Sequence, residues 1–232
     1  MKVAICFPAR NIVETGFAFD AMNLIGHTCA NRPDIQIGIY TSLGTLIIDQ
    51  RCNLAKEAMK EHADYILWID SDMRFPKDGL LRLLAHNRPI VAANYVTRSI
   101  PVEPISFNFT GKAWERQHTF EHSTGLQQVT GTGMGFMLTS TRVFSELEEP
   151  YFHIAYSTVN KTFHGEDMFF CQKAAEKGFP TMIDHDLSKE IKHIGSFEFI
   201  HDHVMVANTA QTVMEEVSGT IEMNRPLEAA AD

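Results

Sequence analysis

The chain has 232 residues, a formal net charge of −9 and a hydrophobic content of 44%. This length suits one large domain, or one domain with an appendage, and it allows a substantial buried core. The negative charge and the lack of a wide cluster of Lys and Arg argue against general binding of polyanions such as nucleic acid.

The first half of the chain alternates between predicted strands and predicted helices. The strands are short runs of β-branched, aromatic and other apolar residues, whereas the helices carry apolar residues at helical spacing. This order is typical of a right-handed, mostly parallel sheet in an α/β protein. The predicted strands cover residues 3–7, 35–40, 65–69 and 90–96, and the predicted helices cover residues 14–30, 47–62 and 76–88.

Residues 65–69, Tyr-Ile-Leu-Trp-Ile, form the central predicted strand, and Asp70 and Asp72 follow it at once. Such an unbroken apolar run indicates a strand covered on both faces, and ligands of these sheets bind beyond the carboxyl ends of the strands. In an extended backbone the two carboxylates would point the same way, about 6.5–7 Å apart, and a divalent cation would offset their repulsion. A solvated acidic turn before a helix explains an isolated Asp-x-Asp as well, so both interpretations stay open at this point.

The second half of the chain is richer in turns. Residues 101–128 contain short candidate strands such as 105–109, and we interpret residues 129–138 as a strand whose glycines allow a ligand or a neighbouring strand to approach closely. Those glycines do not form a phosphate loop, because the third glycine of Gly-x-Gly-x-x-Gly and a following Lys are missing. The remaining predicted elements are a helix over residues 168–177 and a strand over residues 180–183.

The cysteines and the apolar runs indicate the cellular compartment of the protein. The four cysteines lie far apart and form no Cys-x-x-Cys pair, which favours reduced, mostly buried thiols over disulfides or a structural zinc site. The amino terminus has too short an apolar run for a signal peptide, and no stretch approaches the roughly 18 apolar residues that span a bilayer. We therefore expect a cytoplasmic protein without a transmembrane segment.

Five stretches of the chain carry a family resemblance. They are Arg-Cys-Asn at 51–53, Leu-Trp-Ile-Asp-Ser-Asp at 67–72, the segment 133–144 from Gly-Met-Gly-Phe-Met-Leu to Arg-Val-Phe, Gly-Glu-Asp-Met-Phe-Phe-Cys at 165–171, and His-Ile-Gly at 193–195. Taken together, in this order and rough spacing, they resemble the GT-A-fold glycosyltransferases, particularly the family 2-like enzymes, over residues 1 to about 200. The Gln-x-x-Arg-Trp motif of that family is absent, which argues against a processive polysaccharide synthase.

The resemblance implies a fold and a division of the chain. We expect a single GT-A-like domain over residues 1–205, with a Rossmann-like nucleotide-sugar-binding half at 1–98 and a mostly parallel sheet. The acceptor-side, catalytic half would cover residues 99–205 and carry mixed strands. Residues 206–232 are predicted to form a C-terminal helix and a flexible tail.

The resemblance also implies an activity. The protein would move a sugar from a nucleotide-sugar donor, usually a UDP-sugar, to an acceptor hydroxyl with the help of Mn²⁺ or Mg²⁺. The reaction would invert the anomeric centre and use a carboxylate base, but a retaining reaction stays open, because some retaining GT-A enzymes also carry an acidic pair and a metal histidine. The acceptor stays open between a saccharide, a lipid, a protein and a modified nucleic-acid base, and the oligomeric state also stays open.

The family motifs assign roles to residues of this chain. Asp72 would be the direct metal ligand, His193 a further ligand, and Asp70 would contact the metal or the ribose. Asp167 would be the general base, with Glu166 as its neighbour or an acceptor contact, although acidic residues in a first helical turn often only complement the helix dipole. The residues implied to contact the donor are Pro8, Arg10, Arg51, Asp70 and Ser71.

Two other functions use the same residues. A metal-dependent hydrolase or phosphoesterase would combine the aspartates with His185, His201 and His203, since histidine is enriched in this chain, with 11 residues. A non-catalytic module would bind a sugar or nucleotide without transferring it.

Overall fold

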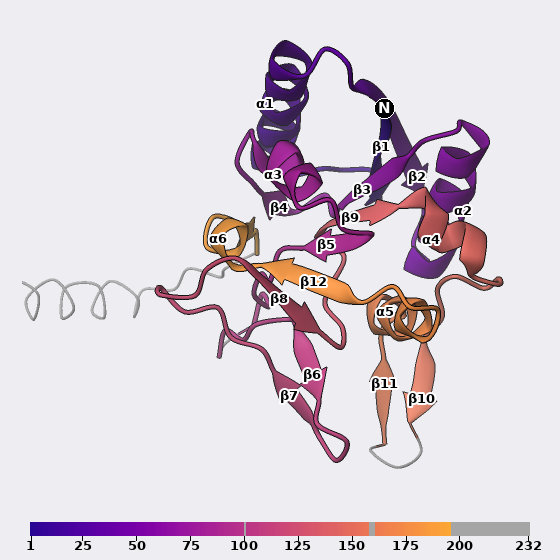
Figure 1. Cartoon of the computed structure of the whole chain (residues 1–232), viewed down its shortest axis with the longest axis vertical. Helices are drawn as coiled ribbons and strands as arrows, with labels where there is room; N and C mark the ends of the chain where they lie inside the picture. Colours follow the sequence, from indigo (N-terminus) through magenta and orange to yellow (C-terminus); the bar gives the residue numbers. More distant parts are fainter. Residues whose placement is uncertain (100, 158–160, 196–232) are drawn as a thin grey trace, which may run out of the picture. The chain divides into compact units, whose positions relative to one another are not determined.

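A mixed sheet forms the centre of the computed structural model, which describes residues 1–99, 101–157 and 161–195 (Figure 1). These residues belong to one unit, Met1–Gly195. The predicted helix and tail at 206–232 lie outside the described residues, as do His201, His203 and the end of the predicted catalytic half.

Within the described residues, the main sheet has seven strands in the order β2-β1-β3-β9-β5-β12-β8. β1 pairs in parallel with β2 and β3, and β12 pairs in parallel with β5, whereas β9 and β8 run antiparallel to their neighbours. The α/β class is therefore confirmed, and the sheet is mixed, with three parallel and three antiparallel strand pairs among the described residues. The strands are β1 (Lys2–Ala9), β2 (Gln36–Leu43), β3 (Tyr65–Ile69), β5 (Ile90–Ala92), β8 (Leu126–Val129), β9 (Phe136–Ser140) and β12 (Thr181–Asp184).

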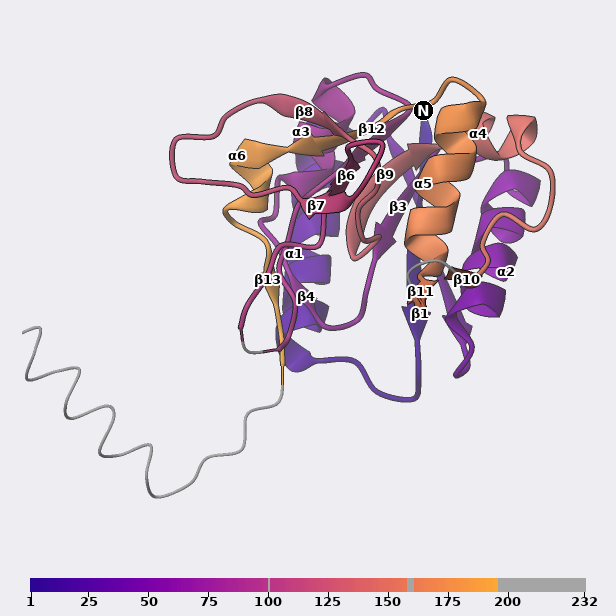
Figure 2. The same cartoon turned by 90° about the horizontal axis from the view of Figure 1, so that it is seen from below.

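Helices cover both faces of this sheet (Figure 2). Side chains alternate along a strand, so that Ile66 and Trp68 of β3 pack toward α2, α4 and α5, whereas Leu67 and Ile69 pack toward α1, α3 and α6. This double coverage explains why β3 is apolar at every position. The helices are α1 (Thr15–Asn31), α2 (Ile47–Lys60), α3 (Gly79–Ala85), α4 (Thr141–Glu146), α5 (Glu166–Glu176) and α6 (His185–Ser188).

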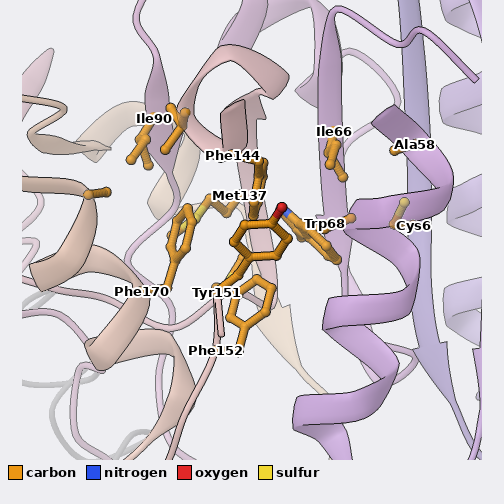
Figure 3. Packing of buried hydrophobic residues seen from close by; sticks show 14 of the residues in the cluster. Cys6, Ala58, Ile66, Trp68, Ile90, Met137, Phe144, Tyr151, Phe152 and Phe170 are labelled. Atoms are coloured by element: carbon orange, nitrogen blue, oxygen red, sulfur yellow. The ribbon is translucent and has the colours of Figure 1, made fainter. Parts of the chain in front are cut away.

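An aromatic cluster fixes α5 against β3 (Figure 3). The ring centroid of Trp68 lies 5.8 Å from that of Phe152 and 6.1 Å from that of Phe144, and Phe170 of α5 stacks 5.3 Å from both phenylalanines. All four side chains are fully buried, and aromatic pairs at such distances stabilise a core beyond their buried area. The cluster thereby sets the position of the amino end of α5 relative to the end of β3.

Three two-stranded sheets complete the described part of the chain. β13 pairs with β4 so that His193 lies opposite Met73, and this brings His193 next to the residues that follow β3. The other two sheets are hairpins that project from the main sheet (Figure 1). The strands are β4 (Met73–Arg74) with β13 (Lys192–His193), β6 (Phe107–Phe109) with β7 (Trp114–Arg116), and β10 (Ala155–Ser157) with β11 (Thr162–His164).

The structure corrects three of the predicted elements. The helix expected from Pro76 begins at Gly79. The strand expected at 90–96 ends at Ala92, because the chain leaves the sheet where the Asn94 amide donates to the Ser188 hydroxyl.

Residues 129–138 do not form one strand, because β8 ends at Val129 and β9 begins at Phe136. Two of the glycines between them, Gly133 and Gly135, accommodate a tyrosine ring, and Gly131 lies against Met168. A Cβ atom on Gly133 or Gly135 would lie 2.5–2.7 Å from the Tyr95 hydroxyl, which accepts a hydrogen bond from the Gly135 amide at 3.0 Å.

The predicted burial of the cysteines is confirmed for two of the four. All four cysteines lie in the described part of the chain and are free; Cys6 and Cys171 are buried, Cys52 is half-buried and Cys29 is exposed. Among the described residues, no helix combines the length and the apolar character needed to cross a membrane.

Candidate functional site

The residues singled out from the sequence line one cavity of about 710 Å³. It lies where β1 and β3 end and α2 begins, which is the carboxyl edge of the parallel strands. The side chain of Gln50 in α2 ties this edge together, because its amide donates to the carbonyl oxygens of Ala9 and Ser42, each at 2.6 Å. The predicted residues that line the cavity are Pro8, Arg10, Arg51, Asp70, Ser71, Asp72, Glu166, Asp167 and His193.

Arg51 is the cation at the base of this cavity, and only 3% of it is exposed. Its Nη2 atom lies 3.1 Å from Asp70 Oδ1, and its Nη1 atom lies 3.3 Å from Glu166 Oε1. Burial alone would lower the pKa of Arg51, but the charges of Asp70 and Glu166 raise it above its usual value. Arg51 therefore links α2, the end of β3 and the start of α5 through charge.

Asp70 and Asp72 do not share one face of an extended strand. The chain turns directly after β3, since the Met73 amide donates to the Asp70 carbonyl at 3.2 Å. Asp70 consequently faces Arg51, whereas Asp72 faces Arg98. The expected i, i+2 alternation fails for this reason, although both carboxylates still line the same cavity.

Asp72 lies between two positively polarised side chains. Its Oδ2 atom is 2.6 Å from Arg98 Nη1 and 3.6 Å from His193 Nε2. Burial on its own would raise the pKa of Asp72, but His193 and Arg98 lower it below its usual value. The Nδ1 atom of His193 lies 2.8 Å from the Val96 carbonyl, which only accepts, so Nδ1 carries a proton, and Nε2 faces Asp72. The Asp72 carboxylate and the Val96 carbonyl raise the pKa of His193 against the effect of burial and thereby favour the imidazolium.

The acidic pair begins α5. Gly165 is the residue before the helix, Glu166 and Asp167 occupy its first turn, and the Met168 amide donates to Asp167 Oδ1 at 2.7 Å. Burial raises the pKa of Asp167 to about 6, and the neighbouring charge of Glu166 adds to this. A carboxyl with this pKa is ionised at neutral pH and is still a much better proton acceptor than an ordinary aspartate.

A second cavity of about 800 Å³ adjoins the first. Residues of both projecting hairpins line it, and its walls are more aromatic than those of the first cavity. Four residues line both cavities and thus form their border: Tyr95, Arg98, Asp167 and His193.

Tyr95 and Arg98 were not singled out from the sequence. Tyr95 is buried, and burial together with the charges of Asp70 and Asp167 raises its pKa well above the usual value. Arg98 follows the predicted strand at 90–96, so the rule that selected Asp70 and Asp72 at the end of the preceding strand selects it as well. Tyr95 lies inside that predicted strand and comes after the strand end only because β5 stops at Ala92.

His185, a candidate for hydrolytic chemistry, lines neither cavity. Its Nδ1 atom lies 2.9 Å from the Thr119 hydroxyl and its Nε2 atom 2.7 Å from Gln127 Oε1. Burial lowers its pKa. The side chain is thus a hydrogen-bonded, structural histidine.

No protein-family model matches the sequence, and no curated protein matches it. Solved structures are similar in fold. One is A197 from STIV, with a TM-score of 0.48 and 14% identity, covering 87% of this chain and 99% of that chain. Another is a glycosyltransferase involved in the glycosylation of the major capsid of PBCV-1, with a TM-score of 0.42 and 13% identity, covering 84% of this chain and 94% of that chain. Both TM-scores are below 0.5 and both identities are below 15%, so the chemistry of this chain has to be argued from its own side chains.

Proposed function

We propose that this protein is a glycosyltransferase that moves a sugar from a nucleotide-sugar donor to an acceptor hydroxyl, with Asp167 as the general base. One observation carries the proposal: a cavity at the carboxyl edge of the parallel strands and a second, aromatic cavity meet at a carboxylate whose pKa is raised to about 6. Group transfer needs two neighbouring binding sites and a base at their border.

The first cavity is assigned to the donor. Ligands of open α/β sheets bind beyond the carboxyl ends of the strands, and the volume of about 710 Å³ is in the range of small-molecule sites. Pro8 lies in the last residues of β1, Arg10 follows β1, and Ser71 follows β3, so these residues would flank the donor. UDP is the nucleotide that the family resemblance favours.

Asp72 and His193 are assigned to Mn²⁺ or Mg²⁺. Two ligands at about 2.1 Å from one cation lie roughly 3–4 Å apart, and the 3.6 Å between Asp72 Oδ2 and His193 Nε2 fits this. In the described part of the chain no group of three or more His, Cys, Asp or Glu is placed to hold a metal ion, so the donor's phosphate oxygens and water would complete the shell. The bound cation would neutralise the charge of the diphosphate. Asp70, which pairs with Arg51, is assigned to the ribose.

Asp167 acts on the acceptor. Its carboxylate takes the proton of the acceptor hydroxyl while the acceptor oxygen forms a bond to the anomeric carbon. The bond between that carbon and the diphosphate oxygen breaks, and its electron pair leaves with the nucleoside diphosphate. Attack from the face opposite the leaving group inverts the anomeric centre. Glu166 pairs with Arg51 and lines the first cavity, so it is assigned as the neighbour whose charge raises the pKa of Asp167.

The alternatives account for less of this geometry. A hydrolase based on His185 has to use a side chain whose two ring nitrogens already have partners. A binding module has no use for a carboxylate with a raised pKa between two cavities, and perturbed pKa values cluster at catalytic sites.

Product analysis tests the proposal. The full chain is incubated with Mn²⁺, a panel of UDP-, GDP- and ADP-sugars, and soluble acceptors of each class, and the products are identified by mass spectrometry. We expect one donor to be consumed and one acceptor to gain a glycosyl unit. Donor hydrolysis at a rate that no acceptor changes would favour a hydrolase, and donor binding without consumption would favour the binding module.

A further inference from the structure

Residues of both projecting hairpins line the second cavity. The two hairpins themselves are seen in Figure 1, β6 with β7 and β10 with β11. β6 and β7 contribute Phe107 and Trp114, and β11 contributes Phe163. The Trp114 ring lies 5.1 Å from that of Phe109 and 5.8 Å from that of His164, so it contacts both hairpins. Phe163 is 71% exposed and therefore contributes little to the core. An aromatic side chain exposed on a cavity wall indicates a ligand that has an apolar face.

The charges of this cavity do not suit a polyanion. Arg116 lies 4.8 Å over the Phe107 ring and pairs with Glu103 at 2.6 Å, and Arg98 pairs with Asp72 at 2.6 Å. The protein itself thus neutralises both arginines, and Lys112 is the one other Lys or Arg in the described lining of this cavity. Together with the net charge of −9, this disfavours a nucleic-acid acceptor.

The distribution of apolar residues in the hairpin of β6 and β7 does not suit a membrane surface either. The turn between β6 and β7 consists of Thr110, Gly111, Lys112 and Ala113, and the aromatic residues lie along the strands behind it. A hairpin that inserts into lipid needs its apolar residues at the tip. The aromatic surface instead belongs to the cavity, whose volume of about 800 Å³ is in the range of small-molecule sites.

From these observations, and on the basis of the proposed function, we infer that the acceptor is a saccharide whose sugar ring packs on Trp114 and Phe163. A sugar ring has a face of C–H groups and a rim of hydroxyls, and the partly positive C–H groups are attracted to the negative face of an aromatic ring. Thr97, Thr162 and His164 line the same cavity and offer hydrogen bonds to the rim. One rim hydroxyl would then face Asp167 at the border of the two cavities.

Intrinsic fluorescence tests this inference without turnover. The chain has two tryptophans, and Trp68 is buried in the core, so Trp114 reports on the second cavity. A printed glycan array first selects saccharides, which are then titrated into the full chain with UDP and Mn²⁺ present. We expect a saturable change of fluorescence with at least one saccharide. Phe163→Ala should weaken its binding about five- to tenfold, because the side chain is exposed and its loss mainly removes the stacking.

Two further variants complete the design. Phe120→Ala removes another exposed aromatic side chain that lines neither cavity, and it should bind the saccharide like the parent. Trp114→Phe should keep most of the affinity, measured by calorimetry, while the fluorescence response disappears.

The outcomes separate this inference from the proposed function. Donor binding without binding of any saccharide, or transfer only to a peptide, lipid or nucleoside, would overturn the saccharide inference and leave the glycosyltransferase assignment in place. Saccharide binding that Phe163→Ala and Phe120→Ala weaken equally would also overturn it. Failure to bind any sugar nucleotide would contradict the proposed function, whatever the saccharide titration gives.

Discussion

Arg98 occupies the side of Asp72 that a cation would need. Its Nη1 atom contacts the same carboxylate oxygen that faces His193. The guanidinium must therefore move when a metal ion and the donor bind, and it is then free to pair with the diphosphate. Arg98 is half-exposed, and ion pairs of this kind contribute about 0.2–1 kcal/mol.

We predict that Arg98→Ala increases the affinity for Mn²⁺ in the absence of donor about two- to fivefold, since the competing cation is gone. The affinity for the sugar nucleotide should decrease in the same variant. Manganese titration followed by electron paramagnetic resonance measures the first effect and calorimetry the second. Arg32→Ala, which removes an equally exposed ion pair with Asp34, is the matched control and should change neither value. Unchanged or weaker manganese binding in Arg98→Ala would exclude the competition.

Asp167 makes stability depend on pH in an unusual direction. Its pKa is about 6 in the folded chain and 3.8 in the unfolded chain, so the folded state binds more protons between these values. Stability is therefore lost as pH rises through that window. Asn cannot titrate, and we predict that Asp167→Asn is more stable than the parent above pH 6, by up to about 3 kcal/mol, and similar to it near pH 4.

Urea unfolding of both chains at several pH values measures this difference. Asp186→Asn is a control of opposite sign, because a hydrogen bond from the Gly125 amide lowers the pKa of Asp186. That variant should have a lower free energy of unfolding than the parent, and this difference should not change with pH above pH 5. If Asp167→Asn shows no pH-dependent gain, the Asp167 carboxyl is not held in a buried environment.

At the scale of single residues, the sequence identified the acidic side chains but not their partners. Asp70 and Asp72 were predictable because they end an apolar strand. The cation that faces each aspartate was not predictable, because the turn at Met73 and the approach of β13 depend on contacts between segments far apart in the chain. Arg51 was expected to contact the donor, and its burial between Asp70 and Glu166 was not foreseen.

At the scale of elements, the amino end of α5 depends on a glycine. A Cβ atom on Gly165 would lie 2.6 Å from Asp167 Oδ1, so any side chain there must displace the carboxylate. The displaced group is the end of a flexible side chain, and the displacement should cost little stability. A shift of about 1 Å in a catalytic group can nevertheless cost about 100-fold in rate.

We therefore predict that the free energy of unfolding of Gly165→Ala is within about 1 kcal/mol of that of the parent, whereas the variant transfers sugar about 100-fold more slowly. Gly26→Ala is the matched control, since a Cβ atom at Gly26 in α1 meets nothing within 4 Å. It should stabilise the helix by about 0.5–1 kcal/mol and leave the rate unchanged. Thermal unfolding and steady-state kinetics of both variants give the answer, and full activity of Gly165→Ala would show that the carboxylate position is not critical.

Periodic elements were predictable, and the glycine-rich segment was not. The strands at 3–7 and 65–69 and the helices at 14–30 and 47–62 follow apolar periods that local sequence displays. Residues 130–135 depart from the strand interpretation because their glycines make room for Tyr95, a residue 35 or more positions earlier. No local pattern contains that information.

At the scale of the whole described unit, function depends on how distant segments meet. β9 inserts between β3 and β5 and runs antiparallel to both, so the order of strands in the sheet differs from their order in the chain. Periodicity predicts that these strands exist but not which ones are neighbours. The two cavities arise from this arrangement, because one uses the ends of β1 and β3 and the other uses hairpins from the second half.

In the proposed function, Asp167 accepts the proton of an acceptor hydroxyl at the border of the two cavities. A base is active only when ionised, so kcat/KM for the acceptor should fall below an apparent pKa near 6 and reach a plateau above it. The most direct measurement compares this pH profile, together with the calorimetric affinity for the donor, between the parent, Asp167→Asn and the exposed control Asp186→Asn.

We predict that Asp167→Asn loses about 10²–10⁴-fold in turnover and that its kcat/KM no longer falls at low pH. Its affinity for the sugar nucleotide should stay within a few-fold of the parent, because the base contacts the acceptor and not the nucleotide. Asp186→Asn should have the pH profile and the donor affinity of the parent. An Asp167→Asn variant that binds the donor, transfers sugar within a few-fold of the parent and keeps the fall of kcat/KM at low pH would contradict this role of Asp167.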